Sequence, residues 1–185
     1  MSPGHARSAA SVEGLVAAAR RRFGELGYEA TSIDDVARDA GRTKGAVYHH
    51  FPDKRALFER VFAVEQQALA AEVARSTTLA GGIATYLRAV ASTPTAARIT
   101  LLDGPAVLGW TRWRSCDDGP FRTMLRRSLD AEEALGRRYD LDLLTDLLLG
   151  AVTEAAQQIV AADDPPSTAR RYERQLRALV HDLVS

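Results

Sequence analysis

Residues 31–58 read TSIDDVARDAGRTKGAVYHHFPDKRALF, and this stretch decides the fold. Apolar residues recur at helical spacing in 33–40 and again in 47–51, with a short turn between the two segments. Gly41 suits the left-handed backbone that ends a helix, and Thr43 can cap the next helix. Two short helices joined by so tight a turn predict a helix-turn-helix, which places its second helix in the major groove of DNA.

The second of these helices, over residues 44–51, has an unusual outer face. Val47 and Phe51 lie one turn apart and are expected to point inward, which leaves Lys44, Gly45 and Tyr48 outside. A glycine near a helix start costs up to ~1 kcal/mol relative to alanine, but it lets another surface approach the backbone. The outer face therefore favours DNA binding over the alternative of three packed helices with a solvated charged face.

The run KGAVYHHFPDKRALF at 44–58 resembles the DNA-binding domain of the TetR family of bacterial one-component regulators. Its motif is a tyrosine, a variable residue, His-Phe, two residues, a lysine and then a leucine. The similarity is strong over residues 12–60 and weaker over the rest, whose length and helical character match that family's regulatory domain. The resemblance implies a homodimer that binds a pseudo-palindromic double-stranded DNA operator and releases it when a small molecule enters the C-terminal domain.

The resemblance also assigns DNA-contact roles by motif position. Residues expected to touch phosphates are Thr43, Tyr48 and Lys54, and those expected to face base edges are Lys44, Gly45, Ala46 and His49. Arg42 stands where the family usually has an apolar residue, so either the turn packs differently or Arg42 adds a phosphate contact. Asp34 would repel phosphate and is left out of the contact set.

Composition narrows the function classes. The 185 residues carry 24 basic and 24 acidic side chains, so no global positive field draws the chain to nucleic acid. One basic face suffices for a specific dimer, and the expected members are Arg20, Arg21, Arg22, Arg42, Lys44, Lys54 and Arg55. Cys116 is the single cysteine, which excludes an internal disulfide and leaves its own role open. The absence of a signal peptide and of a long apolar run predicts a cytoplasmic protein with no membrane partner.

The chain is expected to be all-α, because no segment shows strand alternation. We expect a disordered tail at 1–10, a three-helix DNA-binding domain at 11–53 and a helical regulatory and dimerisation domain at 54–185. The first helix should run over 12–26 and a long helix over 54–75. Breaks are expected at Gly81-Gly82, at 103–105 and in a loop at 115–119, with a helix at 120–138.

Residues 141–161 are apolar on more than one face, so they require cover on most sides. A second subunit can supply that cover, and two such helices from each chain would form a four-helix interface. The alternative is that this segment is the central helix of one chain's core. The interface residues predicted are Leu144, Leu148, Val152, Ile159, Leu176, Leu179 and Leu183.

An effector cavity is expected between residues 86 and 121, where the resemblance places the ligand site. Its candidate residues are Tyr86, Arg98, Trp110, Trp113 and Phe121, and they suit a small hydrophobic or aromatic effector. Ordinary core packing is the competing interpretation for each tryptophan. Arg98 could pair with an acidic ligand or lie on the surface.

Two other function classes compete with a ligand-controlled regulator. An enzyme or metalloprotein is disfavoured because His49 and His50 are adjacent on one helix, point about 100° apart and cannot share a metal ion. No nucleophile with its base and no phosphate-binding loop is present in the sequence, so neither a cofactor nor a catalytic residue is expected. A helix-turn-helix protein without an effector remains the alternative, and it would have a solid C-terminal domain.

Overall fold

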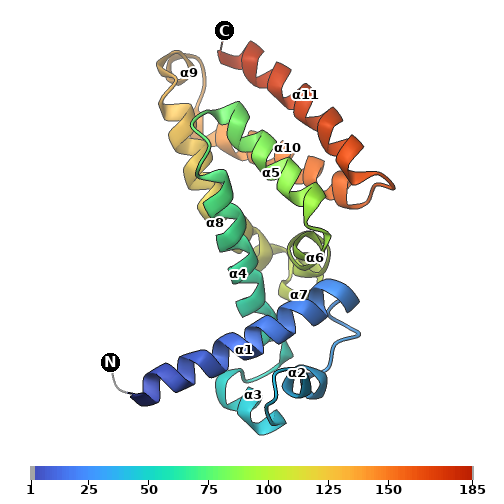
Figure 1. The fold of residues 1–185 in the computed structure, drawn as a ribbon. Coiled ribbons are helices and arrows are strands. Elements are labelled where there is room, and N and C mark those ends of the chain that lie inside the picture. The colour runs from blue at the N-terminus through green and yellow to red at the C-terminus, as the bar shows by residue number, and fades with distance from the viewer. Residues whose placement is uncertain (1–2, 185) are drawn as a thin grey trace.

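A computed structural model of the chain describes the backbone of residues 3–184 and the side chains of 11–115, 119–133 and 135–183. Residues 3–184 contain no strand, which confirms the all-α prediction. The elements, shown in Figure 1, are α1 (Pro3–Leu26), α2 (Ile33–Asp39), α3 (Lys44–His50), α4 (Lys54–Val73), α5 (Leu79–Ser92), α6 (Pro94–Ala97), the π-helix η1 (Arg98–Asp103), α7 (Gly104–Leu108), α8 (Trp110–Asp130), α9 (Glu133–Arg138), α10 (Leu141–Val160) and α11 (Pro165–Val184).

Side-chain caps begin both helices of the helix-turn-helix, and the sequence predicts the one at Thr43. The Ser32 hydroxyl accepts a hydrogen bond from the amide of Asp35 at 3.1 Å, and the Thr43 hydroxyl accepts one from the amide of Ala46 at 3.2 Å. Gly41 joins α2 to α3 with a φ of 63°, which an L side chain rarely adopts. Helix α1 covers the pair, and Leu15, Phe23, Val36 and Val47 are buried among the three helices.

The structure corrects the expected N-terminal tail. Helix α1 begins at Pro3, so residues 3–10, predicted to be disordered, continue the helix that was expected to begin near Val12. The small residues of this segment carried no apolar periodicity, although alanine is the strongest helix former.

The C-terminal domain is a bundle built on α4, which leaves the helix-turn-helix without a linker (Figure 1). Helix α5 packs against α11 and α10, and α8 packs along α10. The long apolar α10 therefore has neighbours of its own chain on two sides.

Three predicted boundaries differ from the structure. Helix α5 begins at Leu79 and includes Gly81-Gly82, because the Thr78 hydroxyl caps it by accepting from the amide of Gly81 at 3.1 Å. Helix α8 runs without interruption through 115–119, with Pro120 inside it, and its packing along α10 outweighs the local turn residues. The expected helix at 120–138 is two helices, since α8 ends at Asp130 and α9 begins at Glu133.

The break expected at 103–105 is also displaced. There η1 passes directly into α7, and the chain turns at Gly109, which has a φ of 79°. Gly104 instead serves close packing, because a Cβ there would lie 3.0 Å from both Phe62 and Trp113.

Candidate nucleic-acid interface and effector cavity

Helix α3 presents the predicted contact residues to solvent. Val47 is fully buried beneath it, whereas Lys44, Gly45 and His49 are exposed and the Tyr48 ring is 46% exposed. Arg42 and Thr43 are exposed in the turn just before, and Ala46 is half-buried. These residues form one outward-facing surface around the start of α3, which we call the α3 surface.

Gly45 has no internal reason to be a glycine. A Cβ built at this position would meet only the Thr43 hydroxyl oxygen, at 3.9 Å, and the φ of Gly45 is not positive. By contrast, a Cβ at Gly24 would lie 2.7 Å from the Cβ of Thr95, so the fold itself requires that glycine. The fold of the chain itself therefore does not require a small residue at position 45.

Lys44 is already paired within the chain. Its ammonium lies 3.0 Å from an Asp34 carboxylate oxygen, and this hydrogen bond raises the pKa of Lys44. Both side chains are exposed, so the pair is weak and can open when a stronger anion arrives. Sequence reasoning left Asp34 out of the contact set and missed this pairing.

Lys54, predicted as a phosphate contact, also has a structural task. Its ammonium donates to the carbonyl of Tyr28 at 2.7 Å and lies 4.0 Å from the centre of the Tyr28 ring. Lys54 therefore ties the start of α4 to the α1–α2 loop, and a phosphate would have to use its remaining N–H groups.

The expected basic face is smaller than predicted. Arg20 pairs with the buried Glu65, Arg22 lies 2.6 Å from Asp39, and Arg55 donates to the carbonyl of Leu108 at 3.0 Å. Arg21 and Arg42 form no ion pair with any side chain that the structure describes. Of these two arginines, Arg42 belongs to the α3 surface.

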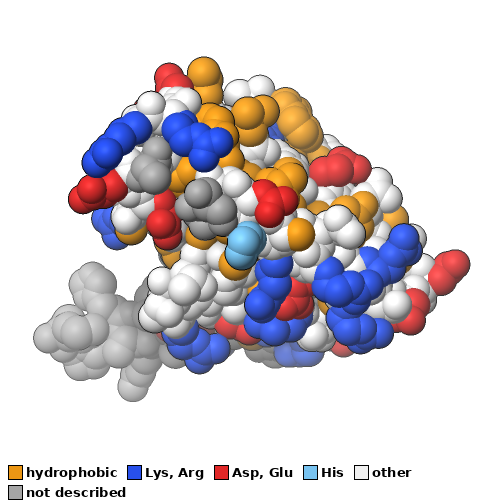
Figure 2. All heavy atoms as spheres, turned by 90° about the horizontal axis from the view of Figure 1, so that it is seen from above, with side chains coloured by type: hydrophobic (Ala, Val, Ile, Leu, Met, Phe, Trp, Pro, Cys, Tyr) orange, Lys and Arg blue, Asp and Glu red, His pale blue; other side chains and the backbone are white. Residues whose placement is uncertain are grey.

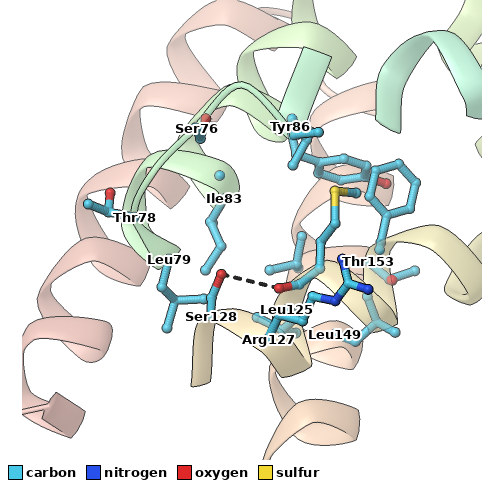
Figure 3. Close-up of a pocket in the computed structure, with 16 residues that line it drawn as sticks. Ser76, Thr78, Leu79, Ile83, Tyr86, Leu125, Arg127, Ser128, Leu149 and Thr153 are labelled. Carbon is cyan, nitrogen blue, oxygen red and sulfur yellow. Dashed lines mark hydrogen bonds between the residues drawn. The ribbon is translucent and has the colours of Figure 1, made fainter. Parts of the chain in front are cut away.

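A cavity of about 290 Å³ opens between the end of α4 and helices α5, α8 and α10 (Figure 3). Tyr86 and Phe121 line it, with their ring centres 5.3 Å apart in an edge-to-face arrangement. The other lining residues are Val73, Ala74, Ser76, Thr78, Leu79, Gly82, Ile83, Met124, Leu125, Arg127, Ser128, Leu149, Val152 and Thr153. Those on α8 recur at helical spacing within the helix expected at 120–138, but the sequence analysis sought the cavity between residues 86 and 121.

Three predicted cavity residues lie elsewhere. Trp113 is fully buried, and its indole N–H donates to the carbonyl of Thr100 at 2.7 Å, so it belongs to the core. Trp110 is 63% exposed, and the Arg98 guanidinium lies beside Gly27 at the end of α1. The prediction that these three side chains line the cavity is wrong, because all of them lie near the junction between the two domains.

The predicted interface residues are mostly on the inner face of α10 and α11. Leu144, Leu148, Val152, Ile159 and Leu176 are buried within a single chain, so a partner cannot be what covers them. On the outer face, Leu147 is 72% exposed and Leu143 is 63% exposed on α10, and Leu179 is 53% exposed on α11. Seen from the end of the molecule opposite α3, apolar side chains gather on the surface among charged ones (Figure 2).

The two domains are docked through the segment around η1. The Tyr28 amide, in the α1–α2 loop, donates to a carboxylate oxygen of Asp103 at 2.9 Å, and the Gly24 backbone lies against Thr95. The same Tyr28 receives the Lys54 hydrogen bond described above. Hydrogen bonds to Tyr28 thus join the helix-turn-helix domain both to η1 and to the start of α4.

This architecture defines a helix-turn-helix protein with an attached all-helical domain that encloses a cavity. The family model described as "Bacterial regulatory proteins, tetR family" matches residues 15–61, and that described as "Tetracyclin repressor-like, C-terminal domain" matches residues 76–183. The chain belongs to the TetR family of transcriptional regulators. The helix-turn-helix is thus a DNA-binding one, and membership confirms that the chain is not an enzyme, because the family is non-enzymatic.

Individual proteins are similar to this chain over different extents. The Transposon Tn10 TetC protein of Escherichia coli is 39% identical over 70 residues, which is 38% of this chain and 36% of TetC, so the match spans about a third of that relative. A solved TetR-family regulator from Pectobacterium atrosepticum is 29% identical and superposes with a TM-score of 0.73, over 99% of this chain and 97% of its own. FadR of Bacillus subtilis, solved in complex with stearoyl-CoA, shares the fold at 17% identity and a TM-score of 0.68, over 89% and 96% of the two chains.

None of the described helices is long and apolar enough to cross a bilayer. Among the same residues, no group of three or more His, Cys, Asp or Glu side chains could hold a metal ion.

Proposed function

We propose that this chain is a repressor that binds a pseudo-palindromic operator as a homodimer and is released when a small apolar or aromatic effector occupies the cavity. The observation that carries this proposal is the combination of an exposed α3 surface with a cavity in the domain docked to it. The cavity also favours this function over a helix-turn-helix protein without an effector, whose C-terminal domain would be solid. FadR, which has the same fold, was solved with a small-molecule ligand, and this supports an effector here.

At the operator, we assign Arg42, Thr43 and Tyr48 to phosphates, and Lys44, Gly45, Ala46 and His49 to base edges in the major groove. Lys54 would add a phosphate contact only through the N–H groups that Tyr28 leaves free. The neutral overall charge limits non-specific affinity, so discrimination between sequences depends on this small surface.

Selection of bound fragments from random duplex DNA tests the proposal directly. The selected fragments should share two inverted half-sites whose centres lie about 34–36 Å apart, one turn of DNA. Compounds that raise the melting temperature of the free chain, found in a thermal-shift screen, should then release the selected duplex. Recovery of no sequence at low salt, or of single half-sites only, would contradict the dimeric repressor.

Replacing Asp34 by asparagine should strengthen binding to duplex DNA of any sequence. The change frees the Lys44 ammonium from its 3.0 Å ion pair and removes a carboxylate that would repel phosphates. Because one more cation then meets DNA, the slope of log affinity against log salt should become steeper by about 1. Titrations of a non-specific duplex at several salt concentrations measure that slope.

Asp163→Asn is the matched control, since it removes the same charge from the exposed loop between α10 and α11. The control should bind like the unaltered chain. Equal salt slopes for D34N and D163N would show that the Asp34 pair does not withhold Lys44 from DNA.

We propose that dimers form through the outer face of α10 and α11, because the inner leucines already pack within one chain. The exposed residues that continue this face around Leu179 are Ala151, Glu154, Gln175, Ala178 and Asp182, and they border a shallow groove between the two helices. A second copy of the same face, related by a two-fold axis, would complete a four-helix bundle.

Effector control would pass through the hydrogen bond between Asp103 and Tyr28. Replacing Asp103 by alanine should lower the free energy of unfolding by about 1 kcal/mol, because a half-buried amide loses its acceptor. Amide hydrogen exchange at Tyr28 should accelerate while exchange in the α10 core stays unchanged. Urea unfolding and exchange measured by NMR test both effects.

Asp103→Asn serves as the matched control for this junction, because its amide oxygen can still accept from Tyr28. D103N should retain slow exchange at Tyr28. If D103A also left that exchange slow, the hydrogen bond would not be what docks the two domains.

A further inference from the structure

One charged side chain lines the cavity wall among the residues that the structure describes, and none of the described side chains forms an ion pair with it. Among the described residues that line the cavity, Arg127 is the only charged one, and no aspartate or glutamate accompanies it. It lies at the exposed rim, extending from α8 toward the side where Tyr86 and Thr153 lie (Figure 3). An arginine on an otherwise largely apolar wall is a candidate for contact with a ligand.

Neighbouring arginines on α8 make the position of Arg127 distinctive. Arg122 lies 3.0 Å from Asp146 and Arg126 lies 3.3 Å from Asp142, and both of these pairs point toward α10. Arg127 has no ion pair or hydrogen bond to any side chain that the structure describes. Its guanidinium therefore keeps its N–H donors available at the mouth of the cavity.

The remaining polar groups of the wall are largely occupied. The Ser128 hydroxyl donates to the carbonyl of Met124 at 3.1 Å, the Ser76 and Thr85 hydroxyls lie 3.1 Å apart, and the Thr78 hydroxyl caps α5. Apolar side chains from four helices line the interior. The cavity thus offers an apolar interior and one planar cationic group at its rim.

We propose that the effector is an amphipathic organic anion, whose apolar body fills the cavity and whose carboxylate pairs with Arg127 at its mouth. This inference rests on the proposed effector-controlled function and names the chemical class of that effector. The volume of about 290 Å³ is at the lower end of ordinary ligand pockets, so it suits a single small molecule. Arginine matches a carboxylate through two parallel N–H···O bonds, which a neutral or cationic head group cannot accept.

In this cavity, affinity and selectivity for the ligand come from different parts of the wall. Burial of the apolar body removes hydrocarbon from water and supplies most of the affinity. Arg127 is exposed to solvent, so its pair with the ligand is screened and mainly decides which head group is tolerated. Arg98, the arginine for which the sequence suggested an acidic partner, lies outside the cavity and cannot fill this role.

The test compares decanoate, decanol and decylamine, which share a ten-carbon chain and differ in head-group charge. Binding to the full DNA-free chain is measured by calorimetry at neutral pH. Decanoate should bind about tenfold more tightly than decanol, with decylamine weakest. Arg127→Met should lower the affinity for decanoate to that for decanol, and should leave the decanol affinity unchanged.

Two further variants keep the result interpretable. Arg137→Met removes an exposed arginine of α9 that does not line the cavity, and it should leave all three affinities unchanged. Met124→Trp enlarges a half-buried wall residue and should block decanoate and decanol alike, which locates binding in this cavity. Melting temperatures and circular dichroism of each variant verify that it folds.

Several outcomes would overturn the inference. They are equal affinity for the three probes, an R127M chain that still prefers decanoate, and binding of none of them. Operator binding and release are measured separately on the same protein. If neutral compounds that bind the cavity release DNA while decanoate does not bind, the proposed function stands and the anionic ligand class is wrong. If decanoate binds through Arg127 but never alters DNA affinity, the ligand class stands and the proposed effector control of DNA binding is wrong.

Discussion

Replacing Leu147 and Leu179 together by glutamate should convert the proposed dimer into monomers and abolish stable operator binding. The two side chains are 72% and 53% exposed on neighbouring helices, so the change costs little within one chain. In a two-fold bundle, it would place unpaired carboxylates in an apolar contact and next to their own symmetry mates. Sedimentation equilibrium should show monomers, and the affinity for a double half-site should fall by at least about 100-fold, because linkage of the two recognition helices is lost.

Leu102→Glu is the matched control, since Leu102 is 48% exposed on η1 and is not part of the proposed interface on α10 and α11. That variant should remain dimeric. Leu148→Glu would be a poor test, because Leu148 is buried and a carboxylate there would destabilise the monomer itself. A dimer that survives in the L147E/L179E chain would show that the subunits meet through another surface.

The choice between Leu147 and Leu148 also shows where reasoning from the sequence ends. Apolar periodicity predicted that α10 is covered on most sides, and the structure agrees that its inner face is buried. Periodicity cannot tell which of two adjacent leucines, about 100° apart, faces the chain's own α5 and α8. That choice depends on where those helices pack, which is a tertiary property.

Local interactions were predicted more successfully than distant ones. The caps at Ser32 and Thr43 depend on residues three positions away, so the helix-turn-helix can be predicted from the local sequence. Lys54 was assigned to phosphate alone because nothing in its neighbourhood indicates the Tyr28 carbonyl, 26 residues away in the chain. Trp113 was assigned to the cavity for the same reason, because its partner carbonyl on Thr100 is brought near by the turn at Gly109.

A methyl group added at position 45 should raise the stability of the chain and lower its affinity for the operator. In the free chain, Gly45→Ala places its Cβ in open space, 3.9 Å from the nearest atom, and removes the backbone entropy of glycine from a helix. The free energy of unfolding should therefore rise by up to ~1 kcal/mol. Against DNA, the same methyl group occupies the space that α3 needs for close approach, so operator affinity should fall by about tenfold or more. Urea unfolding and DNA titration of the same preparation measure the two opposite effects.

Gly14→Ala is the matched control for this separation. A Cβ at Gly14 also meets nothing within 4 Å, but Gly14 is exposed on α1 and is not one of the residues of the α3 surface. G14A should gain similar stability and bind the operator as the unaltered chain does. If G45A bound DNA equally well, nothing would approach the start of α3 closely, and the reason for a glycine there would have to be sought in something other than DNA. If G45A instead lost stability together with affinity, the open space around position 45 would be needed by the chain itself, and the assignment of α3 as the helix that reads base edges would lose its main physical support.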